Sequence, residues 1–252
     1  LPRFAGKQLA EWLYVRRAKS FDEMTNISLK GREALKANYS VGRYTPAAEA
    51  VSVDGTKKYL FAIDGDEAMR RTGNEARYIE SVYIPDNDRA TLCVSTQAGC
   101  KMGCKFCMTG TLGFHGHLSA ADILNQIFSI PDSDKLTNIV YMGEGEPMDN
   151  LDAVLRSLNV LTKDWGCAWS PKRITVSSVG YMPGLKRFLD ESECHLAISL
   201  HNPFGAERQE VMPIEKRYHL TDVVDLLKQY DWTHQRRISF EYICWYNQND
   251  II

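Results

Sequence analysis

Three cysteines with the spacing C-x3-C-x2-C are the residues of this 252-residue chain best suited to chemistry; they are Cys100, Cys104 and Cys107. Three thiolates on one short loop can bind three irons of a cubic iron–sulfur cluster and leave the fourth iron without a protein ligand. An electron-transfer ferredoxin normally closes that position with a fourth cysteine. An open iron is what a cluster needs if it is to bind and reduce a small molecule.

Zinc is the alternative for these thiolates. A closed structural zinc site needs four ligands, and His115 or His117 is available as the fourth. The second C-x2-C pair that is typical of zinc ribbons is absent from the sequence. The spacing therefore favours the open cluster, and a zinc site remains the competing interpretation.

A second candidate group is the segment 143–147, which reads Gly-Glu-Gly-Glu-Pro. It lacks the Lys-Ser/Thr pair of a phosphate-binding loop. Its two glycines let the backbone approach a ligand closely, and Glu146 can accept a hydrogen bond from an ammonium group such as that of S-adenosylmethionine. The alternatives are a tight turn without a ligand for the glycines and a carboxylate favoured by a helix N-terminus for Glu146.

The elements that must position these groups are strands alternating with helices. We expect strands at 91–96, 138–142, 173–178, 195–200 and 237–243, and helices at 119–129, 151–163, 183–190 and 221–230. This alternation predicts a parallel sheet with right-handed crossovers. Loops at the carboxyl ends of such strands build active sites. The cysteine loop, the segment 143–147, Ser177, Ser199 and His201 should therefore face one mouth, where the two serines and the histidine would hold ribose and adenine.

The N-terminal part has a different pattern. We expect an amphipathic helix over 6–19, a second helix over 29–38 and an end to this arm at Pro46. Strands follow within 51–63 and 79–84, with a polar surface loop at 64–77 between them. The predicted organisation is a helical domain at 1–46, a β-hairpin linker region at 47–89 and an α/β partial barrel at 90–252.

Charge and composition limit the function classes. The net charge is −2, yet residues 1–45 contain nine Lys or Arg and four Asp or Glu, so this arm is basic. A basic arm on an acidic body suits contact with a polyanion, although a solvated helix face has the same composition. No apolar stretch reaches membrane-spanning length. Seven cysteines without a signal peptide at Leu1 favour a reducing cytoplasm. We take Cys167, Cys194 and Cys244 to be structural.

These motifs together resemble one family. The cysteine loop, the segment 143–147 and Ser199-Leu200-His201 look like those of a radical S-adenosylmethionine (radical SAM) enzyme. More narrowly, the segments 20–25 (SFDEMT), 80–85 (ESVYIP) and 88–95 (DRATLCVS) resemble the RlmN family of RNA methyltransferases, which modify carbon 2 of adenosine. The resemblance covers nearly the whole chain.

The resemblance implies a radical SAM partial barrel with an RNA-contacting N-terminal domain. It implies methylation of carbon 2 of an adenosine in 23S rRNA and in tRNA through a methyl-carrying cysteine. The cofactors would be a [4Fe–4S] cluster and S-adenosylmethionine, with an electron donor of the flavodoxin or ferredoxin type. By resemblance, Glu80 is the proton acceptor and Cys93 forms a disulfide that resolves the protein–RNA crosslink. The positions matched to cosubstrate binding are Gly145, Glu146, Ser177, Ser199, Leu200 and His201.

Two features depart from the family pattern. Glu144 stands where members carry an apolar residue, and its carboxylate would crowd the cosubstrate site. The chain ends at Ile252, soon after the fifth expected barrel strand, and Cys244 is in the wrong context to be the methyl-carrying cysteine. We therefore expect residues 1–252 alone not to complete a turnover.

Two other functions stay open from sequence. One is a radical SAM enzyme with another substrate, such as an activase acting on a protein. The other is a zinc-stabilised RNA-binding module without catalysis.

Overall fold

The computed structural model describes residues 2, 4–63, 77–233 and 236–250. Its main feature is one eight-stranded sheet with the order β1-β2-β3-β4-β7-β8-β9-β10. The first four strands pair antiparallel and β4 to β10 pair parallel. The bounds are β1 Ala48–Val51, β2 Lys57–Ile63, β3 Arg77–Asp86, β4 Arg89–Cys93, β7 Asn138–Tyr141, β8 Ile174–Ser178, β9 His195–Ser199 and β10 Ile238–Glu241. Since β1 and β10 are the edges of the described sheet, the barrel is partial.

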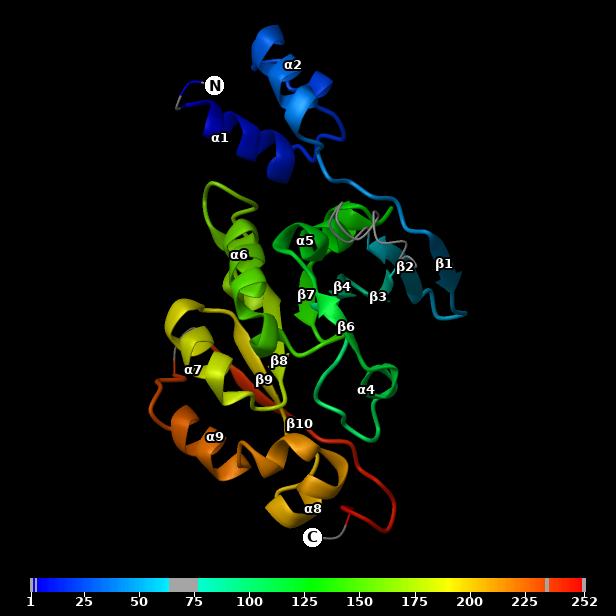
Figure 1. Cartoon of the computed structure of the whole chain (residues 1–252), viewed down its shortest axis with the longest axis vertical. Helices are drawn as coiled ribbons and strands as arrows, with labels where there is room; N and C mark the ends of the chain where they lie inside the picture. The colour runs from blue at the N-terminus through cyan, green and yellow to red at the C-terminus, as the bar shows by residue number, and fades with distance from the viewer. Residues whose placement is uncertain (1, 3, 64–76, 234–235, 251–252) are drawn as a thin grey trace.

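The crossover helices cover one face of the parallel strands. They are α5 Ala120–Phe128, α6 Leu151–Thr162, α7 Met182–Glu191 and α9 Leu220–Leu227; Figure 1 shows α6 and α7 alongside β8 and β9. Alternate strand residues such as Leu92, Ile139 and Val176 are fully buried with Val154 and Phe188 of these helices. The opposite face of β3, β4 and β7 is only half-buried. This alternation leaves one face of the sheet available for a ligand.

The N-terminal arm forms its own small apolar core. It comprises α1 Ala5–Ala10, a π-helical turn at Glu11–Val15, a short 3-10 turn at Phe21–Glu23 and α2 Leu29–Asn38. Phe21, Met24 and Ile27 are buried together at its centre. The prediction of a second helix over 29–38 is confirmed, whereas the first α-helix is shorter than the expected 6–19, because the backbone widens into π geometry at Glu11.

The arm also touches the barrel. The ring of Tyr14 packs against Phe128 and Trp165 at centroid distances of 6.3 and 6.2 Å, and the amide N–H of Tyr44 donates to Asn125 Oδ1 at 2.9 Å. Figure 1 places α1 and α2 at one end of the molecule, beyond the ends of α5 and α6.

Several short elements were not expected from the sequence. They are the hairpin β5 Gln97–Gly99 and β6 Phe114–His117, helix α4 Met108–Leu112, the 3-10 turn η4 Pro147–Asn150, helix α8 Gly205–Val211 and the 3-10 turn η6 Pro213–Lys216. All residues of the loop expected at 64–77 except Arg77 lie outside the described residues. No helix in the described part of the chain combines the length and apolar character needed to cross a bilayer.

Candidate active site

One pocket lies at the carboxyl ends of β7, β8, β9 and β10 and collects most of the expected site residues. Parallel strands bring their carboxyl ends to the same edge, so residues far apart in sequence converge there. Its lining consists of Cys100, Met102, Cys104, Phe106, Cys107, Thr109, Gly110, Tyr141, Met142, Gly143, Gly145, Glu146, Pro147, Ser177, Val179, Ser199, His201 and Glu241. We call it the strand-end pocket. Its lining contains two carboxyl groups and no Lys or Arg, which suits a cationic ligand.

The three cysteines all line this pocket from the loop between β5 and α4. Cys104 is buried, and Cys100 and Cys107 are half-buried. Burial raises the pKa of Cys100 to about 11 and that of Cys104 to about 12. Both groups are therefore thiols at neutral pH, and a metal that binds them must displace their protons.

Three cysteine thiols are a donor set that fits a cubic iron–sulfur cluster, which binds each thiolate through a different iron. Among the described residues, no three His, Cys, Asp or Glu side chains are grouped closely enough to hold one metal ion. Neither His115 nor His117 is part of the pocket lining; His117 Nδ1 instead contacts Gln97 Nε2 at 3.0 Å.

The two glycines of segment 143–147 are required by close packing against the segment after β4. A Cβ on Gly143 would lie 2.7 Å from Ser95 Oγ, and one on Gly145 would lie 2.4 Å from Gln97 Cβ. Gly145 also has φ of +94°, a conformation that side chains disfavour. The tight turn thus explains both glycines without a ligand, while their bare backbone forms part of the pocket wall.

Glu146 has the capping role that its position before Pro147 allowed. Its carboxylate caps η4 by accepting from Met148 N–H at 3.1 Å, and it also accepts from Val179 N–H at 3.0 Å. The side chain is 2% exposed, and burial raises its pKa to about 7. Within the described chain it has no ion-pair partner. A buried carboxyl group without a cation is suited to receiving an ammonium group.

Ser177 and Ser199 are joined by a residue that the sequence did not reveal. Their hydroxyls donate to Glu241 Oε2 at 2.9 and 3.1 Å, and Glu241 stands at the end of β10 and lines the pocket. Because both hydroxyl protons are used in these bonds, the serines offer only lone pairs to a ligand. They can accept from ribose hydroxyls or an amine, and they are poorly suited to bind a phosphate.

His201 is held in one orientation by its neighbours. It has φ of +54°, and its Nδ1 accepts from Ile243 N–H at 3.1 Å. Burial lowers its pKa, so the neutral ring carries its proton on Nε2. The ring packs edge-on to Phe106 at 4.8 Å between centroids. Leu200 is not part of the lining of the strand-end pocket; it lines another cavity with Leu220 and Val224.

Glu80 and Cys93 lie outside the strand-end pocket but on one face of the adjacent strands β3 and β4. Val82 is the direct Cα partner of Cys93, and Glu80 lies two residues from it on the same half-buried face. The Glu80 carboxylate lies 3.3 Å from Lys58 Nζ. Burial raises the pKa of the Cys93 thiol to about 11.

The expectation that Glu144 crowds the cosubstrate site is wrong. Its carboxylate turns away from the pocket and accepts from the backbone N–H groups of Glu80 at 3.0 Å and Gly99 at 3.1 Å. Its own N–H donates to Ser95 Oγ, which donates in turn to the Glu80 carbonyl. Glu144 therefore ties the strand of Glu80 to the start of the cysteine loop.

Comparisons with known proteins agree with this fold and site. The profile described as the radical SAM superfamily matches residues 94–251, which places the chain in that class of enzymes. A second profile, the ribosomal RNA large subunit methyltransferase N-terminal domain, matches residues 2–41.

Similar proteins define the family. The chain is 57% identical over 250 residues to the probable dual-specificity RNA methyltransferase RlmN of Bacteroides thetaiotaomicron, covering 99% of this chain and 70% of that protein. It is 37% identical to the dual-specificity RNA methyltransferase RlmN of Geobacter sulfurreducens, covering 99% of this chain and 67% of that protein. The crystal structure of a radical SAM methyltransferase from Sphaerobacter thermophilus matches all of this chain and 73% of that one, with 32% identity and a TM-score of 0.88. The chain belongs to the RlmN family of radical SAM methyltransferases.

Proposed function

We propose that this protein methylates carbon 2 of adenosine in 23S rRNA and in tRNA through a methylated cysteine. The observation that carries the proposal is the strand-end pocket. It joins the three cysteines to a buried acid, two serines and a histidine at one edge of the sheet. Family membership supports the methyl transfer, and the names of the relatives support an RNA substrate. The cytoplasm is the proposed location, with a flavodoxin or ferredoxin as the reductant.

Cys100, Cys104 and Cys107 would bind a [4Fe–4S] cluster through three of its irons. When bound, the cluster supplies the electron that cleaves S-adenosylmethionine and yields the radical that starts the reaction. The residues around it would orient the cosubstrate. Glu146 and the Gly145 backbone would receive the ammonium group, Ser177 and Ser199 would accept from the ribose, and Nε2 of His201 would donate to a ring nitrogen of adenine. Leu200 would contribute only through its backbone.

Glu80 and Cys93 would act on the RNA side of the reaction, Glu80 as proton acceptor and Cys93 as the thiol that resolves the crosslink by forming a disulfide. Their common face on β3 and β4 supports a joint role. Because the Cys93 pKa lies at about 11, its thiol stays protonated until a base takes the proton. Protonation protects the thiol from oxidation before the crosslink forms.

The basic N-terminal arm would supply affinity for the RNA backbone. The arm carries nine cationic against four anionic side chains up to residue 45, and Lys7, Lys19 and Lys30 are among the cationic ones. Contacts of this kind are independent of sequence and weaken as salt is added. The target adenosine itself must leave its stack to reach a pocket at a barrel mouth.

Reductive cleavage of S-adenosylmethionine tests the central claim. Protein reconstituted with iron and sulfide under anaerobic conditions should be brown and, with dithionite, should form 5′-deoxyadenosine. The Cys104→Ser variant should lose both properties, whereas Cys194→Ser, at a buried thiol outside the pocket, should retain them. A colourless protein that binds zinc instead and forms no 5′-deoxyadenosine would favour the RNA-binding module without catalysis.

A further inference from the structure

A short segment after β9, residues 205–216, lies beside the strand-end pocket and contacts two parts of it that are far apart in the sequence. It contains α8 and η6; Figure 1 shows α8 at the end of the sheet near β10. One half of the pocket is the cysteine loop. The other half is formed by the ends of β8 and β9, with Ser177, Ser199 and His201, and the end of β7, the segment after it and Glu241 complete the lining. The two halves are separated by 70 residues of sequence from Cys107 to Ser177 and by 101 from Cys100 to His201. Contacts in the fold must therefore set their spacing.

Arg208 of this segment binds the strand-end half. Its Nη2 donates to the carbonyls of Val179 and Ser199, each at 2.9 Å, and its Nε donates to the carbonyl of Leu200 at 3.1 Å. These carbonyls come directly after β8 and at the end of β9, where the sheet ladder no longer supplies donors. The planar guanidinium serves all three in one geometry, which a lysine ammonium cannot reproduce.

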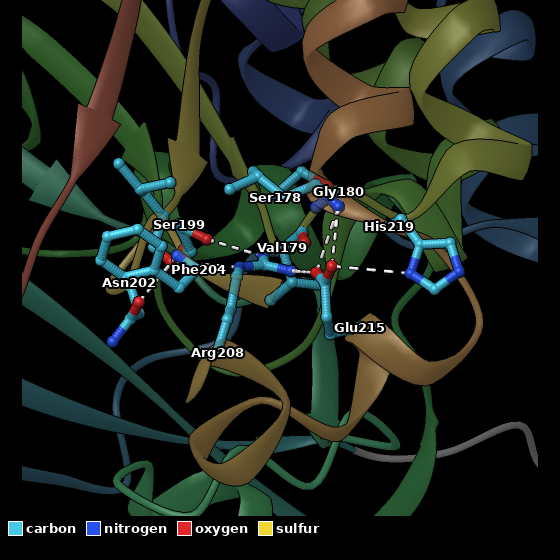
Figure 2. Close-up of polar contacts among 11 residues, drawn as sticks. Ser178, Val179, Gly180, Ser199, Asn202, Phe204, Arg208, Glu215 and His219 are labelled. Atoms are coloured by element: carbon cyan, nitrogen blue, oxygen red, sulfur yellow. Dashed lines mark hydrogen bonds and ion pairs between the residues drawn. The ribbon is translucent and has the colours of Figure 1, made fainter. Parts of the chain in front are cut away.

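Glu215 completes the arrangement and keeps Arg208 in place. Its carboxylate pairs with Arg208 Nη1 and accepts from Leu220 N–H at 3.0 Å. Figure 2 shows Arg208 with Ser199 and Val179 on one side and the Glu215 carboxylate on the other, and His219 lies beyond Glu215. His219 Nδ1 is 3.7 Å from that carboxylate. Both charged side chains are at most 5% exposed. A buried pair with its remaining donors and acceptors satisfied fixes one geometry.

The same segment holds the cysteine half. Met212 is fully buried in an apolar cluster with Met102 and Cys104. The N–H of Lys105, inside the cysteine loop, donates to the carbonyl of Val211 at 2.9 Å. Residues 208 to 215 thus connect the loop that carries the thiols to the strand ends that carry the serines and the histidine.

We propose that Arg208, locked by Glu215, is a positioning residue that sets the spacing between the cysteine loop and the cosubstrate contacts on β8 and β9. It is not part of the pocket lining and acts through the backbone of Val179, Ser199 and Leu200. This inference rests on the proposed function, because a ligand that spans both halves gives the spacing its importance. Small displacements of positioning groups can reduce binding and rate severely.

The test compares cosubstrate affinity with stability. Arg208→Lys keeps the positive charge but loses the planar guanidinium that donates to the three carbonyls. In reconstituted protein it should bind S-adenosylmethionine roughly tenfold or more weakly, and the change that the ligand produces in the EPR spectrum of the reduced cluster should shrink. Iron content should equal that of the wild type. Leu158→Ala, in the core of α6 and away from the pocket, serves as a control for lost stability, and Arg187→Lys on the exposed face of α7 as a control for the substitution.

Glu215→Gln is the second variant, because it leaves the three contacts between guanidinium and carbonyls in place. Its affinity should fall less than that of Arg208→Lys. Equal affinity for S-adenosylmethionine in both variants and the wild type overturns the positioning role. The role is also overturned if Leu158→Ala, with the same melting temperature as Arg208→Lys, loses affinity to the same extent. If the wild type itself binds no S-adenosylmethionine, the proposed function fails. If the wild type and both variants bind it equally well, only the positioning role fails.

Discussion

The buried carboxyl group of Glu146 should make the unliganded protein less stable as the pH rises. Its pKa is raised from 4.5 to about 7, chiefly by burial, against hydrogen bonds from Val179, Ser178 and Met148 that favour the ionised form. The charge of nearby Asp149 adds to the increase. The proposed role in binding an ammonium group requires a carboxyl group without a counter-charge, and this costs the unliganded protein stability.

The sign follows from proton binding. In the unfolded chain Glu146 ionises near pH 4.5, whereas in the folded protein it stays protonated up to about pH 7. Between these values the folded state binds more protons, so its stability falls as the pH rises through that window. At ~1.4 kcal/mol per pH unit, the total is about 3 kcal/mol.

Glu146→Gln removes this dependence, because a neutral amide has no proton to lose. Relative to the wild type, the variant should gain about 3 kcal/mol in free energy of unfolding between about pH 4 and about pH 8. Urea unfolding of iron-free, reduced protein at several pH values measures the difference, and other titrating groups cancel in it. Glu33→Gln, at an exposed site on α2, should run parallel to the wild type. Parallel curves for Glu146→Gln as well would refute the reasoning.

Two further substitutions test the close packing at Gly145 and the hydrogen bonds of Glu144 beside the pocket. Gly145→Ala should destabilise the protein by roughly 1–3 kcal/mol, since φ of +94° and a Cβ 2.4 Å from Gln97 both oppose it; a thermal melt equal to that of the wild type would contradict the packing. Glu144→Leu should destabilise by about 1–3 kcal/mol for each N–H group left unpaired at Glu80 and Gly99. Glu144→Gln, which keeps one acceptor, should lose less in urea unfolding, and an equal loss in both variants would argue against these bonds.

The parallel strands were predictable because each is a short apolar run followed by polar residues. The expected strands at 138–142, 173–178 and 195–200 agree with β7, β8 and β9 to within a residue or so at each end. The pattern also placed the cysteine loop, the segment 143–147 and His201 at strand ends. Burial of alternate residues against crossover helices is a strong local signal, and loop position then follows from chain direction.

Helix α8 escaped prediction for the opposite reason. Its sequence Gly-Ala-Glu-Arg-Gln-Glu-Val has no apolar residues at helical spacing, and a segment without this periodicity is predicted to be a loop. What stabilises it is the buried pair of Arg208 and Glu215 and the backbone carbonyls that Arg208 serves. Charged residues are normally exposed, so a sequence offers no means of separating this arginine from a solvated one.

Glu241 and Glu144 show the same limit in the site itself. Both are acids at ordinary positions, one at the end of a strand and one in a glycine-rich turn, and only tertiary structure gives each a role. Glu241 accepts hydrogen bonds from the hydroxyls of Ser177 and Ser199, and Glu144 accepts hydrogen bonds from two backbone N–H groups. The motif therefore locates the pocket, but residues outside the motif set the hydrogen-bonding pattern that decides which ligand groups the pocket can bind. A pocket lined by two acids, with both serine protons already donated, should favour a cationic nucleoside over a nucleotide phosphate.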